Sequence, residues 1–331
     1  MKNQEKVFIT GATGLIGSHL TRKLLGEGFQ VRALVRNPEK ARWLENIGAE
    51  IVQGDVTDAQ SLVPAIQGCQ YVFHAAAWVS ERGSKEEIWK ANVLGTQNTV
   101  NAALAAQVQR FIHISSCAVY GSRQTFDIDE TFPTRKTGKL YWDSKIDAEE
   151  VVQRAQKQHN LPVVIARVSQ VYGPDSYQFT IRPVEVIKSG KMILIDGGRH
   201  MCKPVYISNL IDGLIHCAKK DQAIGEIFNL TDGYPVPWKD FFCAYGRMLG
   251  KSSFPTLPYS LAWTAALLFE IQAGATGKKA SFTRSAVHSL RSSNSFSNRK
   301  AIAILNWQPR YNLEQGMQQT ESWLRSQGYI T

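Results

Sequence analysis

The chain has 331 residues, of which 44% are hydrophobic and 20% charged, a balance typical of a folded globular protein rather than a disordered one. No apolar run approaches the roughly 18 residues that a spanning helix needs, so a membrane-spanning protein is not expected. The five cysteines are scattered and the histidines show no ligand spacing, so we expect reduced thiols, a cytoplasmic location and no metal site.

The first half of the chain alternates β-rich runs with helical patterns. Strands are predicted at residues 6–10, 30–35, 50–53, 71–75, 110–115 and 162–168, with helices at 15–28, 85–106 and 138–159. Strands separated by helices form βαβ units, whose right-handed connections build a doubly wound parallel sheet. The predicted fold class is therefore α/β, with a Rossmann-type sheet and a smaller, mainly helical lobe toward the C-terminus.

Beyond residue 175 the pattern becomes irregular and mainly helical. Two more strands are predicted at 205–207 and 226–230 around a helix at 208–219, followed by helices at 237–249, 258–272, 283–291, 298–305 and 313–327. We expect residues 1–175, with a return segment at about 203–232, to form the sheet domain. Residues 176–202 and 233–331 are expected to form the second lobe, packed against the first because no linker separates them.

A glycine-rich turn joins the first predicted strand to the first helix. The sequence TGATGLIG, from Thr10 to Gly17, has a glycine at every third position. Small residues there let backbone N–H groups reach a pyrophosphate, which lies at the positive end of the helix. This context predicts that residues 1–175, with the return segment, form a dinucleotide-binding domain and that the second lobe binds the substrate. The cofactor contacts expected from the turn are Gly11, Thr13, Gly14, Leu15, Ile16 and Gly17.

The end of the second predicted strand indicates which dinucleotide binds. An acidic residue there accepts hydrogen bonds from the ribose 2′-hydroxyl of NAD, whereas a basic residue meets the 2′-phosphate of NADP. This chain has Arg36 at the tip, no acid before Glu39, and Lys40 close behind, so NADP(H) is favoured over NAD(H). The alternative is that Arg36 is an ordinary surface residue. Asp55, after the third strand, is expected to accept from the adenine amino group.

Tyr141 and Lys145 are four residues apart and therefore on one face of a predicted helix. Hydride transfer to a carbonyl leaves an alkoxide that must gain a proton, which a phenol can supply. A free phenol has a pKa of about 10, and a neighbouring ammonium lowers that pKa, which gives Lys145 a chemical role. Ser116 follows the fifth predicted strand, at the edge where ligands bind in such sheets, so its hydroxyl can bond the substrate oxygen.

These residues resemble the extended short-chain dehydrogenases/reductases, which include sugar-nucleotide epimerases, dihydroflavonol reductases and 3β-hydroxysteroid dehydrogenases. The resemblance covers nearly the whole chain and rests on TGATGLIG, GDVTD, HAAA, NVLGTQN, SSCAVYG, YWDSK, ARVSQVYGP, EIFNLTDG and NWQPRYNLEQGMQQTESW. It implies that Ser116, Tyr141 and Lys145 are catalytic, and that helices 85–106 and 138–159 pair in a homodimer. Besides the glycine turn, it implies cofactor contacts from Arg36, Lys40, Asp55, Val56, Ala75, Ala76, Ala77, Tyr141, Lys145 and Val168.

The sequence departs from the sugar-nucleotide enzymes where they bind the substrate diphosphate. Cys202 stands where they usually have arginine and Asn209 where they have aspartate, although Lys203 or Arg199 could substitute. Two buried negative charges without a partner are costly. We therefore predict an NADP(H)-dependent oxidoreductase that reduces a carbonyl, or oxidises the alcohol, of a largely apolar steroid, flavonoid or acyl substrate. The alternatives are a nucleotide-sugar epimerase/dehydratase and a non-catalytic NADP sensor or nucleic-acid-binding relative.

Several side chains near the predicted site can line a substrate pocket or simply pack in the core. These are Trp78, Cys117, Trp142, Tyr172, Tyr177 and Phe179. His74, at the end of the fourth strand, is expected to be a structural imidazole rather than a catalytic base.

Residues 182–331 carry most of the net charge of +10, with 18 Lys and Arg against 10 Asp and Glu. No nucleic-acid partner is expected, because no recognition motif with interleaved aromatic residues accompanies this charge. The predicted helix 258–272 is apolar nearly all round, which indicates burial against the core or the substrate pocket. The alternative is shallow insertion at a membrane surface, held by Lys251, Lys278, Lys279 and Arg284.

Overall fold

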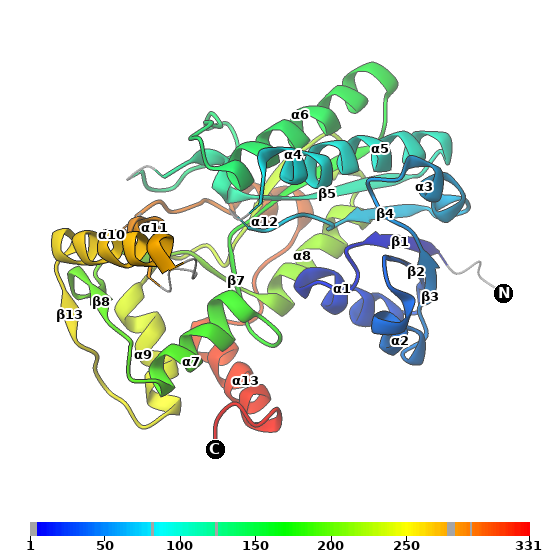
Figure 1. The fold of residues 1–331 in the computed structure, drawn as a ribbon. Helices are drawn as coiled ribbons and strands as arrows, with labels where there is room; N and C mark the ends of the chain where they lie inside the picture. The colour runs from blue at the N-terminus through cyan, green and yellow to red at the C-terminus, as the bar shows by residue number, and fades with distance from the viewer. Residues whose placement is uncertain (1–4, 81–82, 123–124, 277–281, 292) are drawn as a thin grey trace.

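The computed structural model describes residues 5–80, 83–122, 125–276, 282–291 and 293–331 (Figure 1). Its centre is a parallel sheet of seven strands in the order β11-β6-β5-β4-β1-β2-β3. The strands are β1 (Lys6–Thr10), β2 (Gln30–Val35), β3 (Glu50–Gln53), β4 (Tyr71–His74), β5 (Arg110–Ser116), β6 (Val163–Val168) and β11 (Ile227–Leu230). The order reverses between β1 and β4, and ligands bind beside the carboxyl ends of strands at such a switch point.

Helices cover both faces of this sheet (Figure 1). On one face lie α1 (Leu15–Gly26), α2 (Pro38–Asn46) and α8 (Ile207–Lys219). On the other lie α3 (Ala59–Ile66), α5 (Gly95–Ala105) and α6 (Leu140–His159). Because both faces are covered, the strands are mainly apolar and buried, as in β6, where Arg167 is the one charged residue among five apolar ones.

The predicted helix 85–106 consists of three parts. A π-helical turn, η1 (Lys90–Leu94), separates α4 (Lys85–Trp89) from α5. The wide turn carries Asn92, whose side-chain oxygen accepts from the Trp78 N–H at 2.6 Å and whose amide donates to Ser144 Oγ at 2.9 Å. The interruption therefore ties the loop after β4 to α6, and π turns of this kind often occur near functional sites.

The C-terminal lobe joins short strands to a set of helices. Three two-stranded sheets pair β7 (Gln170–Tyr172) with β10 (Pro204–Tyr206), β8 (Leu194–Ile195) with β13 (Thr256–Leu257), and β9 (Met201–Cys202) with β12 (Val236–Pro237). The remaining helices and turns are η2 (Cys117–Tyr120), η3 (Tyr177–Ile181), α7 (Arg182–Lys188), η4 (Asp196–Gly198), η5 (Asp221–Ala223), α9 (Trp238–Met248), α10 (Tyr259–Thr276), α11 (Arg284–Arg291), α12 (Arg299–Leu305) and α13 (Leu313–Ser326). Phe241, Trp307 and Met317 of this lobe belong to the same apolar cluster as β1, so the core is continuous.

The predicted α/β class with a parallel sheet and a helical C-terminal part is confirmed. The strand boundaries differ by one residue at most, since β4 ends at His74 and β5 continues to Ser116. Apart from β10, which was predicted at 205–207, the strands of two or three residues and the short helix α7 were not predicted, because segments this short carry little readable periodicity.

A buried ion pair links the sheet to α6. The Arg167 guanidinium, on β6, donates to both carboxylate oxygens of Glu149 at 2.7–3.2 Å, and both side chains are almost fully buried. Ser115 Oγ of β5 donates to the same carboxylate at 2.5 Å, and Arg167 also donates to the Tyr120 hydroxyl at 2.9 Å. A desolvated pair with this many hydrogen bonds fixes the relative positions of β5, β6 and α6.

We expect Arg167→Ala to lower the free energy of unfolding by about 3–5 kcal/mol, because it leaves the Glu149 carboxylate buried without a partner. Urea denaturation measures this, with Arg325→Ala as a control that breaks an exposed pair with Glu321 and costs about 0–1 kcal/mol. Equal losses in the two variants would contradict the structural importance of the buried pair.

Candidate active site

The turn between β1 and α1 is built for close backbone packing. Gly11 has φ +70°, and a Cβ on it would lie 2.7 Å from the Ala76 nitrogen in the loop after β4. A Cβ on Gly17 would collide with the Gly11 carbonyl oxygen. Ala75 and Ala76 donate their N–H groups to the Thr10 backbone and side-chain oxygens, each at 3.2 Å. The turn and this loop therefore approach each other as the glycine spacing predicts.

The N-terminus of α1 fits an anionic group. Gly14 is its N-cap, and among the described residues no side chain caps the helix or adds an acid to its first turn. Thr13 and Gly14 are exposed, whereas Leu15 and Ile16 are half-buried. The N–H groups of this first turn, together with the helix dipole, match the requirements of a pyrophosphate. These residues thus fit a dinucleotide cofactor.

The expected adenosine-binding residues follow β2 and β3, at the same edge of the sheet. Arg36 is exposed directly after β2, and Asn37 caps α2 by accepting from the Lys40 N–H at 3.2 Å. Asp55 is half-buried after β3, where one carboxylate oxygen accepts from the Thr57 N–H at 2.8 Å. The side chain of Arg36 is therefore accessible from solvent, so that it can contact a substituent on the ribose of a bound cofactor.

Three other expected cofactor contacts lie on neighbouring elements. Val56 packs against Gly95 of α5, and its carbonyl accepts from Asn98 Nδ2 at 3.0 Å. Val168 ends β6 in register with Ser116 of β5, and Ala77 is half-buried after β4. Ser116 and Val168 thus end neighbouring strands.

The two adjacent serines at the end of β5 have different surroundings. Ser115 is buried and its hydroxyl is committed to the Glu149 carboxylate. Ser116 is half-exposed, and its Oγ accepts from the Ala118 N–H at 3.2 Å. This hydroxyl keeps its own proton for donation, which suits it to bond a substrate oxygen.

Tyr141 and Lys145 occupy the first two turns of α6. Tyr141 is half-buried, whereas Lys145 is buried and its Nζ donates to the Ile114 carbonyl at 2.8 Å. Ile114 lies two residues before Ser116 on β5, so the structure brings the start of α6 against the strand that carries the serine. Burial lowers the pKa of Lys145 to about 8, although the negative charge of Glu149 acts in the opposite direction and raises it.

His113 of β5 is a site residue that the sequence did not indicate. Its Nε2 lies 3.4 Å from Lys145 Nζ, and its ring stacks on His74 with centroids 5.6 Å apart. Burial and the charge of Lys145 lower the pKa of His113 well below its usual range, so the neutral ring can accept from the ammonium. A single histidine inside a buried strand has no spacing pattern that could have revealed it.

His74 has the structural environment that the sequence favoured. Its Nδ1 lies 2.9 Å from Thr10 Oγ1 and its Nε2 lies 3.0 Å from Thr96 Oγ1, so both ring nitrogens are engaged. Burial, with the charge of Lys145, lowers its pKa to about 3. A neutral imidazole whose two nitrogens are both hydrogen-bonded is poorly suited to act as a base.

Two of the six residues predicted to line a pocket, Tyr172 and Cys117, are buried in the core. Tyr172 packs edge-on against Phe241, and Cys117 is buried with its thiol directed to the Arg167 carbonyl. Their apolar character thus reflects packing. Phe179 is half-buried against the core, Trp142 is half-buried beneath the Lys139 ammonium at 3.7 Å, and Trp78 and Tyr177 are exposed.

The residues that replace the diphosphate-binding set have structural partners. Asn209 is buried, and its amide donates to Asp232 and to the Tyr311 carbonyl at 2.8 Å each. Cys202 is buried and Arg199 is mostly exposed. Lys203 is buried in the C-terminal lobe, and desolvation lowers its pKa to about 8.

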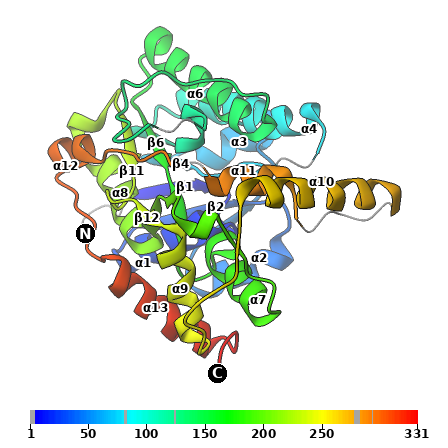
Figure 2. The same cartoon turned by 90° about the vertical axis from the view of Figure 1, so that its left-hand side faces the viewer.

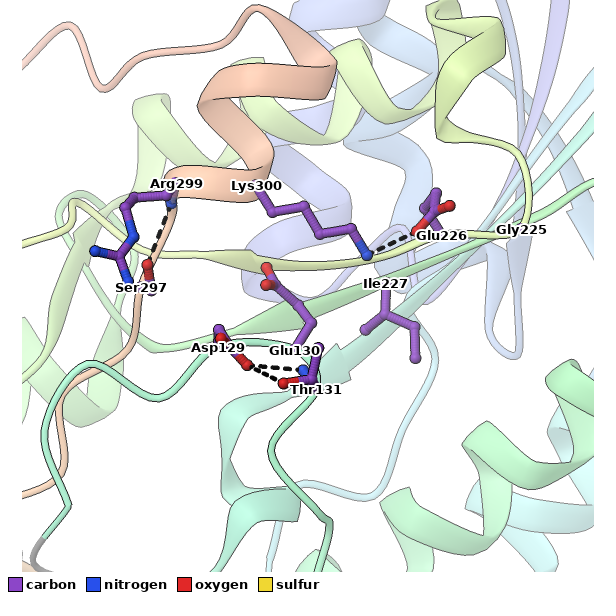
Figure 3. A pocket seen from close by; sticks show the side chains of 9 residues that line it. All are labelled: Asp129, Glu130, Thr131, Gly225, Glu226, Ile227, Ser297, Arg299 and Lys300. Atoms are coloured by element: carbon purple, nitrogen blue, oxygen red, sulfur yellow. Dashed lines mark hydrogen bonds and ion pairs between the residues drawn. The ribbon is translucent and has the colours of Figure 1, made fainter.

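A surface pocket of about 460 Å³ lies away from these residues (Figure 3). It is lined by Asp129, Glu130, Thr131, Gly225, Glu226, Ile227, Ser297, Arg299 and Lys300. Figure 3 shows interactions between several of its polar groups, including the ion pair of Lys300 and Glu226, which are 2.7 Å apart. We do not assign it to the active site, because no residue of the Ser116–Tyr141–Lys145 set lines it.

No group of three or more His, Cys, Asp or Glu side chains in the part of the chain that the structure describes could hold a metal ion. All five cysteines are free and buried.

Comparisons with known proteins agree with this geometry. The chain is 31% identical over 317 residues to a 4-hydroxy-2-methyl-3-oxo-4-farnesyl-3,4-dihydroquinoline-1-oxide ketoreductase of Stigmatella aurantiaca, covering 94% of each protein. It is 28% identical over 250 residues to a 3-beta-hydroxysteroid dehydrogenase of Mycolicibacterium neoaurum, covering 71% of this chain and 68% of that protein. The crystal structure of gox2253 has a TM-score of 0.81 at 28% identity, covering 99% of this chain and 100% of the other.

The family model described as "NAD dependent epimerase/dehydratase family" matches residues 7–231. That range contains the glycine turn, the serine at the end of β5 and the tyrosine–lysine pair of α6. The chain therefore belongs to the NAD-dependent epimerase/dehydratase family and is an NAD(P)-dependent enzyme of the extended short-chain dehydrogenase/reductase kind.

Proposed function

We propose that this enzyme uses NADP(H) to reduce a carbonyl, or to oxidise the corresponding alcohol, in a largely apolar hydroxy/keto substrate. The observation that carries the proposal is the buried Lys145, which joins the first turns of α6 to the end of β5. In this proposal a phenol, an ammonium and a serine hydroxyl act together at the carboxyl end of the sheet, as carbonyl reduction requires.

Each side chain has a distinct task in this proposal. When bound, NADP(H) supplies or accepts the hydride. Tyr141 gives its phenolic proton to the substrate oxygen during reduction and takes it back during oxidation. Ser116 donates a hydrogen bond to the same oxygen, and Lys145 stabilises the phenolate by its charge. The neutral His113 accepts from Lys145 and helps to hold its amino group in place.

Two observations support an apolar substrate: the absence of the usual diphosphate-binding arginine and the names of the relatives. The usual diphosphate-binding arginine is replaced by the buried Cys202. The relatives reported above are a ketoreductase of a farnesylated quinoline oxide and a hydroxysteroid dehydrogenase. Both names describe substrates with a large apolar part, a farnesyl group in one and a steroid skeleton in the other.

A nucleotide-sugar epimerase or dehydratase is the second candidate, supported by the family description and by the buried Lys203. Desolvation lowers the pKa of this lysine, and its charge interacts with Cys117, which directly follows Ser116. The purified enzyme can be offered apolar ketones and UDP-sugars while NADPH absorbance is followed. Ketone-dependent consumption of NADPH supports the reductase, whereas conversion of a UDP-sugar without net consumption supports the epimerase.

Cofactor preference is expected to depend on Arg36. We predict that Arg36→Ala weakens NADPH binding by about 1.5–3 kcal/mol, roughly ten- to a hundredfold, because it removes a charged partner of the 2′-phosphate. NADH affinity should change little. Fluorescence titration measures both, with Arg247→Ala as a control for loss of an exposed charge in the C-terminal lobe. Equal losses for NADPH and NADH would refute the assignment.

Tyr141→Phe is expected to leave NADPH binding intact and to lower turnover by about 10²–10⁴-fold, since it deletes only the transferable proton. Tyr329→Phe, which removes a hydroxyl next to the C-terminus, is the matched control and should keep full turnover. If Tyr141→Phe retained more than about a tenth of the rate, another group must supply the proton.

A further inference from the structure

Helix α10 leaves most of its apolar surface uncovered. Its buried side chains are the small Ala262 and Ala266, which pack with Ile195 and Val287 in a minor cluster. Figure 2 shows α10 extending away from the sheet domain, with α11 beside it. The expectation that this helix is buried against the core or the substrate pocket is therefore wrong for most of its length.

The outward face of α10 is mainly apolar, and the hydroxyl of Thr264 on this face is bonded within the helix, to the Ser260 carbonyl. Leu261, Leu268 and Ile271 are 57%, 62% and 59% exposed, and their spacing of seven and three residues places them on one helical face. Trp263 and Phe269 are also exposed, at 37% and 46%. An apolar face of this extent marks a surface that another apolar phase covers.

Charge at this surface is positive. No charged residue occurs between Tyr259 and Phe269, and the next one, Glu270, pairs with Arg284 at 2.7 Å. The Arg284 guanidinium lies 5.1 Å from the Trp263 ring centroid, and that of Arg291 lies 4.3 Å from the Tyr259 ring centroid. Helices α10 and α11 together carry two arginines, Arg284 and Arg291, against one acid, Glu270, so an anionic partner is favoured.

We propose that α10 docks on an anionic lipid surface, with Leu261, Leu268 and Ile271 inserted among the acyl chains and Arg284 and Arg291 facing the headgroups. The helix lies in the plane of the interface, as amphipathic membrane-binding helices do. Of the described helices none is long and apolar enough to cross a membrane. Exposed tryptophan and arginine side chains beside an apolar face suit the headgroup boundary.

A second copy of the chain fits this face less well than lipid does. In a symmetric dimer the same surface meets itself, so the arginines that flank α10 would approach their own counterparts. The one acid of the helix is already paired with Arg284 and cannot neutralise them. Anionic headgroups supply the negative charge that a second copy lacks.

Docking would bring the active site close to the lipid. Asn294, just beyond α11, donates to the Gly121 carbonyl at 2.8 Å, in the segment that follows Ser116. His288 of α11 is near Lys139, two residues before Tyr141: burial and the Lys139 charge lower the pKa of His288. The lipid contact does not depend on the proposed reductase activity, and can be tested without it.

Co-sedimentation of the full-length protein with vesicles tests the proposal. We expect binding to phosphatidylcholine vesicles that contain about a third phosphatidylglycerol, weaker binding to pure phosphatidylcholine, and loss on raising salt from about 0.05 to about 0.5 M. Leu268→Glu/Ile271→Glu should reduce binding about tenfold or more, since both side chains are exposed and their exchange spares the core. The control variant Val63→Glu/Ile224→Glu makes the same kind of exchange at two apolar residues elsewhere on the molecule, each 44% exposed. It should bind vesicles like the wild type.

The outcomes separate lipid from the other occupants. No sedimentation of the wild type, or equal sedimentation of Leu268→Glu/Ile271→Glu and the wild type, overturns the proposal. A fall in molar mass by light scattering for this variant, without vesicle binding of the wild type, assigns the face to a second copy and also overturns it. Circular dichroism shows that the variant is folded, and NADPH turnover without vesicles reports separately on the reductase proposal.

Discussion

The ion pair between Arg167 and Glu149 is the constraint on which the position of α6 against the sheet depends. Tyr141, Lys145 and Glu149 follow one another at intervals of four residues, so they share one face of α6. The pair holds this face of α6 against β6 at Glu149, and Ser115, which precedes Ser116, donates to the same carboxylate. Once these contacts form, the tyrosine and the reactive serine are brought to the same edge of the sheet.

Much of the sheet domain could be predicted because its signals are local. Strands such as β1 and β6 are apolar runs bounded by turns, and the glycine turn has a spacing that close backbone packing requires. The tyrosine–lysine pair is visible at helical spacing. Their cofactor and catalytic roles remain predictions, as do the domain boundaries and the homodimer.

Features that arise from tertiary contacts could not be predicted in this way. The π turn η1 depends on what Asn92 meets in a distant helix, and the role of His113 depends on α6 lying across β5. Tyr172 is an aromatic residue of the kind that lines substrate pockets, yet it packs against Phe241 in the core. Helix α10 shows the opposite limit: its composition indicated burial, whereas the fold leaves its larger side chains outside.

The buried cysteines have a practical consequence. Burial raises the pKa of the thiols of Cys69, Cys117, Cys202 and Cys217, and Cys243 is buried as well. Thiolate is the reactive form, so the native side chains react slowly with alkylating dyes. One new cysteine on an exposed turn can therefore carry a fluorophore or spin label selectively, with all five native cysteines left in place.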